Sequence, residues 1–319
     1  MIDFLMKKPS IVFLDAATVG FEGEIKAFSE LGTYTQHAMT LPAERIARTG
    51  GYEIVITNKV VIDREVMDAC RELKLVCVAA TGMNNIDLEY ADKKNIAVKN
   101  VSGYSTASVA QSAFSMLFYL MHSSLYYDDY VKSGAYSRSP VFTHHGRQFH
   151  ELDGKIFGII GMGTIGKQVA KIAAAFGSEV VYHSTSGKNQ KAGFRHLDLP
   201  TLMEQSDFIS IHCPLNEHTR NLIDREHLLM MKKSAYLLNL GRGGIVDEAA
   251  LAGALDQDTI AGAALDVLSS EPISEDNPLL KVNNKHKLFI TPHIAWASIE
   301  ARERLINSIA GNIKEFLSS

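Results

Sequence analysis

The sequence predicts an α/β protein with two doubly wound parallel-sheet domains, and three observations support this. Short β-rich runs alternate with helical stretches over the first hundred residues. A glycine-rich turn between a strand and a helix opens a second block of the same alternation near residue 155. An amphipathic helix follows this block at 297–317. Repeated strand–helix–strand units give parallel sheets with helices on both faces.

The first block consists of short strands rich in Val and Ile, separated by helical stretches that carry the charges. Runs of this length and composition predict buried strands of a parallel sheet. We expect strands at 11–15, 53–57, 75–80 and 96–100, and helices at 21–31, 63–73 and 85–95.

A long helix and a polar arm separate the two blocks. Residues 106–132 contain no Gly or Pro, and their apolar residues recur at helical spacing, which predicts one continuous helix. Residues 133–154 are polar, aromatic and glycine-bearing, which is typical of an extended arm. The second block then runs to residue 293, and we expect its strands at 155–160, 179–183, 207–212, 235–240 and 260–267.

The bulk composition argues against several classes of function. The 319 residues suggest about two domains, and 46% apolar with 21% charged residues is usual for a globular protein. The net charge is −4 without a long Lys or Arg run, so we expect no nucleic-acid partner. The most apolar segment, 113–121, is too short to span a bilayer, and the N-terminus has no signal peptide, so we expect no membrane partner.

The three cysteines favour a cytoplasmic protein. Cys70, Cys77 and Cys213 do not pair evenly, and none belongs to a Cys-x-x-Cys motif. This argues against a disulfide framework and against a structural metal site. We therefore expect reduced cysteines and no metal.

The turn after the strand at 155–160 carries the signature of a dinucleotide site. Gly161, Gly163 and Gly166 form a Gly-x-Gly-x-x-Gly motif that leads directly into a helix. The first glycine permits the tight turn, the second lets the backbone approach a pyrophosphate, and the third allows the helix to pack closely. A glycine-rich turn alone is weak support, but the strand before it and the helix after it favour NAD or NADP.

The residue that should read the adenosine ribose is Ser184. An NAD site usually places an acidic residue there, and here no carboxylate repels the 2′-phosphate of NADP. Ser184, Thr185 and Lys188 offer hydroxyls and a cation that suit such a phosphate. An ordinary solvated loop in an NAD enzyme fits equally, so both cofactors stay open, with a slight preference for NADP tolerance.

Four polar residues follow predicted strands of the second block. Arg242 lies in a glycine-flanked turn, Asp266 and Glu271 follow the next strand, and His293 follows the last. All four fall at the carboxyl edge, where open α/β sheets bind ligands. Reduction of a 2-oxoacid needs such groups, because a His donates the proton, a carboxylate orients it, and an Arg binds the substrate carboxylate. Each residue alone has an ordinary structural explanation, since the chain holds 12 His.

Four segments in this order resemble the D-isomer-specific 2-hydroxyacid dehydrogenase family over nearly the whole chain. They are GMGTIG, LNLGRGGIVDEAAL, ALDVLSSEP and ITPHIAW. The resemblance implies that Arg242 binds the substrate, that His293 is the acid–base and that Glu271 is its partner. The implied reaction is reversible hydride transfer to a 2-oxoacid.

The resemblance also implies further contacts, residue by residue. Thr81 and Gly82 of ATGMNNID should meet the substrate carboxylate through backbone N–H groups. Trp296 should line the substrate pocket, although core packing fits it equally well. The remaining residues should contact the cofactor: Thr164 and Ile165 at the pyrophosphate, His212, Cys213 and Pro214 at the nicotinamide ribose, Leu240 and Gly241 beside the nicotinamide, and Asp266 at its carboxamide.

The domain arrangement implied by the resemblance is discontinuous. A Rossmann NAD(P)-binding domain, 103–291, would be inserted into a flavodoxin-like substrate domain made of 1–102 and 292–319. Residues 105–150 resemble the family's dimerisation element, so we expect a homodimer, although plain core packing is the alternative for that helix.

Within the family the chain resembles the hydroxypyruvate reductase and glycerate dehydrogenase branch, on segments such as ITNKVVIDREV, GYSTASVAQ, SPVFTHHGR and PHIAWAS. The alternative is another D-2-hydroxyacid dehydrogenase, acting on D-lactate or a branched 2-oxoacid. Formate dehydrogenases pair the His with Gln, which argues against that class because Glu271 is present. Long phosphoglycerate dehydrogenases carry a regulatory domain that we do not expect here, and corepressor-like dinucleotide sensors carry tails that are not seen.

Overall fold

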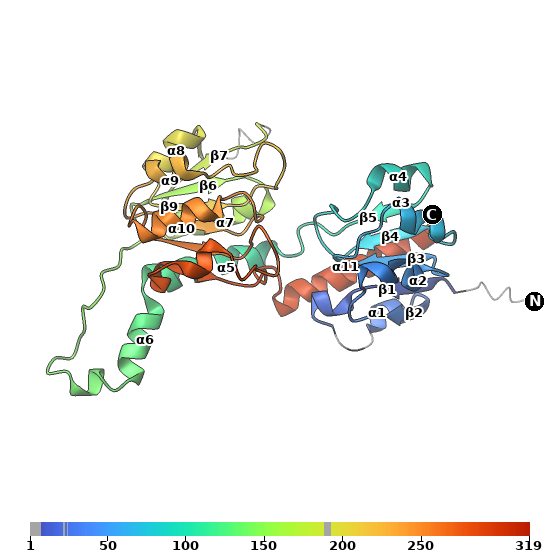
Figure 1. Cartoon of the computed structure of the whole chain (residues 1–319), viewed down its shortest axis with the longest axis horizontal. Coiled ribbons are helices and arrows are strands. Elements are labelled where there is room, and N and C mark those ends of the chain that lie inside the picture. The colour runs from blue at the N-terminus through green and yellow to red at the C-terminus, as the bar shows by residue number, and fades with distance from the viewer. Residues whose placement is uncertain (1–7, 22, 24, 188–192) are drawn as a thin grey trace, which may run out of the picture. The chain divides into compact units, whose positions relative to one another are not determined.

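The computed structural model describes residues 8–21, 23, 25–187 and 193–319, which form two compact units. The first unit consists of Met1–Ser105 with Ala297–Ser319, and the second of Thr106–Trp296. Each contains one sheet whose strand pairs are all parallel, with helices packed against it (Figure 1). The predicted α/β fold with two parallel sheets is confirmed.

The first unit has five strands in the order β2-β1-β3-β4-β5, which is the flavodoxin-like order. Its helix α11 (Ile299–Ser318) contacts β4 and buries Leu305, Ile309 and Ile313. The strands are β1 Ser10–Phe13, β2 Thr33–Gln36, β3 Ile54–Thr57, β4 Leu75–Val78 and β5 Ala97–Lys99. The other α-helices are α1 Lys26–Ser29, α2 Arg45–Thr49, α3 Arg64–Ala69 and α4 Leu88–Lys93.

The second unit has seven strands in the order β12-β11-β10-β9-β6-β7-β8. This is the Rossmann order with one further strand. The order in which successive strands are added to the sheet reverses between β6 and β9, and such sheets bind dinucleotides at this point. The strands are β6 Ile156–Ile160, β7 Glu179–His183, β8 Arg195–His196, β9 Phe208–Ile211, β10 Tyr236–Asn239, β11 Gly262–Leu265 and β12 Leu288–Ile290.

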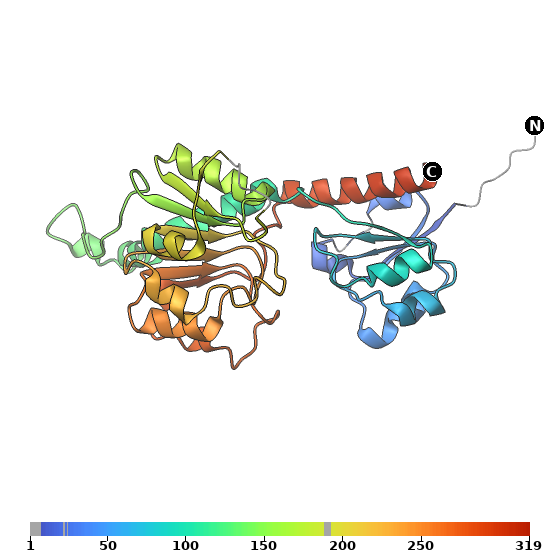
Figure 2. The same cartoon turned by 90° about the horizontal axis from the view of Figure 1, so that it is seen from above.

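Helices cover both faces of this seven-stranded sheet, as Figure 2 shows. One apolar core lies under α5 (Thr106–Met121) and α7 (Thr164–Ala175). The other core lies under α8 (Leu199–Gln205), α9 (Arg225–Met230) and α10 (Glu248–Asp256). The sheet is therefore buried on both faces, and its carboxyl edge remains as the place where polar side chains can meet a ligand.

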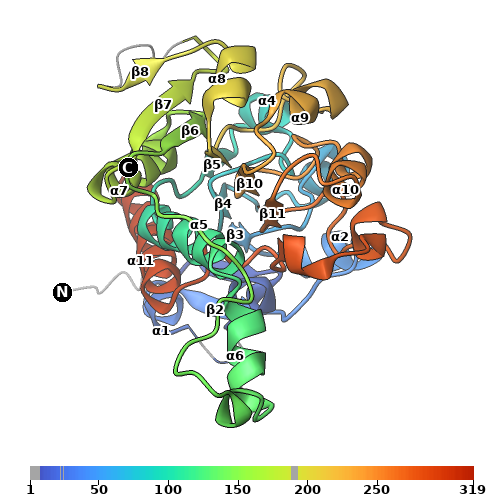
Figure 3. The same cartoon turned by 90° about the vertical axis from the view of Figure 1, so that its left-hand side faces the viewer.

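The prediction of one continuous helix over 106–132 is wrong. The helix ends at Met121, and α6 (Ser124–Lys132) begins after Ser123, whose φ is +50°. A residue in the left-handed region cannot continue a right-handed helix, so the chain turns there. Helix α6 has no buried residue and extends away from the rest of its unit (Figure 3).

The helix expected at 21–31 is also shorter, since only Lys26–Ser29 forms α1, and residues 22 and 24 lie outside the described part. Strands β2 and β8 were not predicted. Among the described residues, no helix combines the length and apolar character that crossing a bilayer requires.

Candidate active site

The glycine-rich turn after β6 is closely packed at two of its three glycines. Gly161 has a φ of +95°, and a Cβ there would lie 2.5 Å from the backbone N of Cys213. A Cβ on Gly166 would collide with the carbonyl oxygen of Gly161. At Gly163 a Cβ would meet nothing within 4 Å. The first and third glycines therefore let α7 pack against the sheet, and the second leaves an open surface where the helix begins.

This open surface suits the pyrophosphate of a dinucleotide. Gly163 is the N-cap of the 12-residue helix α7, and Thr164 and Ile165 form its first turn. Their backbone N–H groups and the helix dipole both favour a bound anion at this point. The residues present thus fit the phosphates of NAD or NADP.

The adenosine end of the same edge lies after β7. Ser184 directly follows β7 and is buried, Thr185 is half-buried, and neither carries negative charge. His183 precedes them, and burial lowers the pKa of its ring below the usual value. Lys188, the third predicted contact of a 2′-phosphate, lies outside the described residues.

His212 and Cys213 follow β9 at the point where the strand order reverses. The His212 Nε2 lies 2.8 Å from Ser210 Oγ, while Nδ1 is buried and has no partner among the described residues. Burial lowers the pKa of His212 to about 3 and raises the pKa of the Cys213 thiol to about 12. Both side chains are therefore neutral at physiological pH, and Cys213 is not a nucleophile. Pro214 follows them and is exposed.

Arg242 lies in a turn that a buried amide holds in shape. Asn239 Oδ1 accepts from the Gly241 N–H at 3.1 Å, and its Nδ2 donates to the Arg242 carbonyl at 2.9 Å. Leu240 is buried in the turn, while Arg242 is exposed. Asn239 is not predicted from the sequence, because a polar residue inside an apolar strand gives no sign of its partners.

Glu271 and His293 form a hydrogen-bonded pair. Glu271 Oε2 lies 2.6 Å from His293 Nδ1, and Oε1 accepts from the Leu268 N–H at 3.0 Å. The side chains are 35% and 27% exposed. Because Nδ1 faces the carboxylate, Nε2 is the nitrogen positioned to exchange a proton with a ligand.

The backbone of His293 is held in an unfavourable conformation. Its φ is +55°, in the left-handed region that non-glycine residues seldom adopt, and its N–H donates to the Asp266 carbonyl at 2.9 Å. Such strain persists only where surrounding contacts enforce it, and it is frequent at functional sites.

Asp266 supplies several of these contacts. Its carboxylate is 3% exposed and accepts from Thr291 Oγ1 at 2.6 Å, from the Ile294 N–H at 2.9 Å and from the Ala295 N–H at 3.0 Å. Burial raises the pKa of Asp266, and these three hydrogen bonds oppose the rise. The resemblance implies that Asp266 bonds the nicotinamide carboxamide, and in the structure both of its carboxylate oxygens bind the loop that carries His293.

Helix α5 fastens the same loop from the other side. Ser108 Oγ donates to the Ala295 carbonyl at 2.6 Å, and Ser112 Oγ donates to the same oxygen at 3.3 Å. Trp296 is partly buried and packs against the core under α5 and α7. The loop after β12 is therefore held through both the N–H and the carbonyl of Ala295.

The structure thus brings Arg242, Asp266, Glu271 and His293 to the carboxyl ends of β10, β11 and β12 within the second unit. Thr81 and Gly82 belong to the first unit, where they follow β4. There Thr81 Oγ1 donates to the Val101 carbonyl at 3.1 Å.

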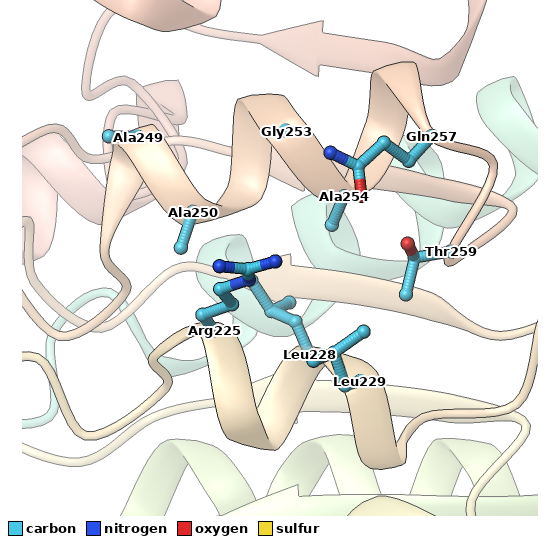
Figure 4. Close-up of a pocket in the computed structure, with 9 residues that line it drawn as sticks. All are labelled: Arg225, Leu228, Leu229, Ala249, Ala250, Gly253, Ala254, Gln257 and Thr259. Atoms are coloured by element: carbon cyan, nitrogen blue, oxygen red, sulfur yellow. The ribbon is translucent and has the colours of Figure 1, made fainter.

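A pocket between α9 and α10 lies elsewhere on the second unit (Figure 4). Arg225 is its only charged lining residue, and neither a carboxylate nor an imidazole lines it. It therefore lacks the groups for acid–base chemistry. The described residues also contain no cluster of His, Cys, Asp or Glu that would hold a metal ion.

Comparison with known proteins places this site in a family. Residues 114–295 match the family model described as "D-isomer specific 2-hydroxyacid dehydrogenase, NAD binding domain". The hydroxypyruvate reductase of Blautia hydrogenotrophica is 38% identical over 92% of this chain and 91% of its own length. The glycerate dehydrogenase of Methylorubrum extorquens is 35% identical over 97% of this chain and 96% of its own.

A solved structure shows the same similarity in three dimensions. The NADPH-dependent glyoxylate/hydroxypyruvate reductase of Sinorhizobium meliloti, solved with NADP and malonate, superposes with a TM-score of 0.82 at 25% identity. The match covers 98% of this chain and 95% of that one. The chain described here belongs to the D-isomer specific 2-hydroxyacid dehydrogenase family, and its second unit contains that family's NAD-binding domain.

Proposed function

We propose that the protein reversibly reduces a small 2-oxoacid with NAD(P)H, taking hydroxypyruvate to D-glycerate and glyoxylate to glycolate. The observation that carries this proposal is the Glu271–His293 pair at the carboxyl edge of a dinucleotide-binding sheet, with Arg242 at the end of a neighbouring strand. The names of two relatives, hydroxypyruvate reductase and glycerate dehydrogenase, support hydroxypyruvate and D-glycerate as the substrates of the two directions.

His293 is the proton donor in this proposal. When bound along this edge, NAD(P)H would supply the hydride that C2 of the oxoacid accepts. Glu271 holds His293 Nδ1 across 2.6 Å, which fixes the tautomer and the orientation of the ring. His293 Nε2 then donates its proton to the substrate's carbonyl oxygen, and in the reverse direction it removes the proton from the hydroxyl group.

Arg242 binds the substrate carboxylate. A guanidinium offers two parallel N–H donors that match a carboxylate, and Asn239 keeps the turn in shape so that this side chain stays exposed. We assign backbone N–H groups near Thr81 and Gly82 to the same carboxylate, and Trp296 to the wall of the substrate pocket.

The cofactor lies along the carboxyl edge of the second sheet in this proposal. The pyrophosphate binds at Gly163, Thr164 and Ile165, for which the open surface and the helix N-terminus are the support. Ser184 and Thr185 lie at the adenosine ribose, and the absence of a carboxylate at these two positions favours acceptance of NADPH as well as NADH. The nicotinamide ribose and ring are bordered by His212, Cys213, Pro214, Leu240 and Gly241.

We further propose that residues 103–291 act as the cofactor domain and that 1–102 with 292–319 act as the substrate domain. A homodimer formed through residues 105–150 belongs to the same proposal. Its support is the apolar surface of this arm, where Phe142 is 89% exposed and Val141 and Phe149 are also exposed. The three free cysteines favour a cytoplasmic location.

The decisive experiment is a panel of hydroxypyruvate, glyoxylate, pyruvate and 2-oxoisovalerate, each with NADH and with NADPH. We expect the highest kcat/KM with hydroxypyruvate or glyoxylate. Higher activity with pyruvate or 2-oxoisovalerate would overturn the substrate assignment. Absence of cofactor oxidation with every pair would overturn the proposed activity.

A further inference from the structure

Glu248, in the first turn of α10, binds both ends of the loop that carries Glu271. Its Oε1 accepts from the Ser269 N–H at 2.6 Å, and its Oε2 accepts from Ser269 Oγ at 2.8 Å. The same Oε2 accepts from Asn277 Nδ2 at 2.6 Å. Ser269 comes just before Glu271 and Asn277 comes after it, so a single carboxylate closes the base of the loop.

This closure matters because the loop itself is exposed. Ser269, Ser270, Glu271 and Pro272 all lie at the surface, where an unfastened segment would sample many conformations. The far end is firmly placed, since Asn277 is 7% exposed and its Oδ1 also accepts from the Leu279 N–H at 2.9 Å. Glu248 ties the near end to this anchor, which restricts the positions that Glu271 can take.

The fastening reaches Glu271 through one residue, Leu268, which lies between two successive peptide groups. The Leu268 N–H donates to Glu271 Oε1 at 3.0 Å, and the next N–H, that of Ser269, donates to Glu248. Gly243 packs so tightly on the peptide between Leu268 and Ser269 that a Cβ there would collide with the Leu268 carbonyl. This peptide therefore lies between the turn of Arg242 and the carboxylate of Glu248, and the N–H of the peptide before it binds Oε1 of Glu271, the oxygen opposite the one that faces His293.

We infer that Glu248 is a positioning residue for the proposed reaction, acting through Glu271 on the orientation of His293. This inference rests on the proposed function, because it takes the Glu271–His293 pair as the acid–base. A carboxylate that is displaced by a fraction of an ångström orients its histidine less well, and a misplaced catalytic group loses rate steeply.

The test compares Glu248→Ala with Glu226→Ala in the full-length protein. Glu226 is an exposed glutamate in the first turn of the neighbouring helix α9, so it matches Glu248 in residue type and helix position. We expect Glu248→Ala to lower kcat by roughly 10- to 100-fold, with little change in the KM for NAD(P)H. Glu226→Ala should leave both readouts unchanged.

A double-mutant cycle then separates positioning from general stability. In a Glu271→Gln background, Glu248→Ala should cost little further kcat, since the group through which it acts is already altered. A wild-type kcat in Glu248→Ala would overturn the inference. The same loss in both backgrounds would also overturn it. Thermal unfolding and NAD(P)H binding of each variant show whether it is folded. The variant Glu248→Gln keeps one acceptor oxygen, so it should recover part of the kcat that Glu248→Ala loses.

The same series separates failure of this inference from failure of the proposed function. If His293→Asn and Glu271→Gln keep full activity, then the acid–base assignment itself is wrong. If these two variants are inactive while Glu248→Ala resembles wild type, only the role of Glu248 is wrong.

Discussion

The N–H of His293 donates to the carbonyl of Asp266 across 2.9 Å, while the Asp266 side chain binds the residues on either side of His293. Backbone and carboxylate of one buried residue thus hold the histidine in its left-handed conformation. This relationship gives Asp266 a task that does not depend on the cofactor, and the two roles can be separated by experiment.

Asp266→Asn should destabilise the protein even without cofactor. An amide NH₂ would face the donor of Ile294 or Ala295, and a buried unsatisfied group costs about 1–3 kcal/mol. We expect a lower free energy of unfolding in urea together with a lower kcat. Thr291→Val removes only one of the three donors and should cost less. Wild-type stability with a raised KM for NAD(P)H would instead support a role at the nicotinamide.

His293→Asn should lose turnover while it retains the cofactor. Asn tolerates the left-handed region better than most residues, so this substitution preserves the backbone at φ +55°. Removing a general acid typically costs roughly 10²- to 10⁴-fold in rate. Fluorescence titration should show NAD(P)H binding within a few-fold of wild type. A variant that still reduces the substrate at the wild-type rate would remove His293 as the proton donor.

Ser184→Asp should discriminate between the two cofactors. A carboxylate at the end of β7 would repel the 2′-phosphate of NADPH and accept hydrogen bonds from the ribose of NADH. We expect kcat/KM with NADPH to fall by about tenfold or more, and kcat/KM with NADH to change much less. Ser184→Ala is the control for loss of the hydroxyl alone. Equal losses with both cofactors would show that Ser184 does not contact the ribose.

His212 should stay neutral in the folded protein down to acid pH, and the protein should therefore become less stable as the pH falls. Its pKa of about 3 lies below the ordinary value of 6.5, so between these two values the unfolded chain binds more protons at this site than the folded chain does. The contribution to stability is therefore complete above pH 6.5 and is lost as the pH falls toward 3. Urea unfolding at pH 7.5 and pH 5 should show a smaller loss in His212→Asn than in wild type. An identical loss in the two proteins would contradict the burial of this ring.

Much of the fold was accessible from the sequence because buried parallel strands are short, continuous apolar runs. The edge strands β2 and β8 were missed because TYTQ is polar and largely half-buried and RH is polar and exposed, so their composition resembles that of loops. The break at Ser123 was missed because no Gly or Pro marks it.

Some residues of the candidate site could be predicted from the sequence and others could not. The motifs around Arg242, Glu271 and His293 are local in sequence, so they could be predicted. Glu248 was not, because its role depends on a partner that tertiary folding supplies, Asn277, 29 positions away. Asn239 was not, because a single polar residue at the end of an apolar strand does not indicate that its amide binds the turn that follows. Periodicity and spacing report which face of an element is buried, but they do not report which polar groups meet across it.

The hydrogen bond from Ser108 to the Ala295 carbonyl joins the two ends of the second unit, which runs from Thr106 to Trp296. In the first unit Arg304 Nε likewise donates to the Tyr104 carbonyl at 2.8 Å, so the two cut ends of that unit also lie side by side. A domain whose termini are adjacent can be inserted at one point of a host, or removed from it, with little loss of loop entropy. This chain therefore has the geometry of a modular insertion, in which each unit could be excised, permuted or replaced while the backbone path of the other is preserved.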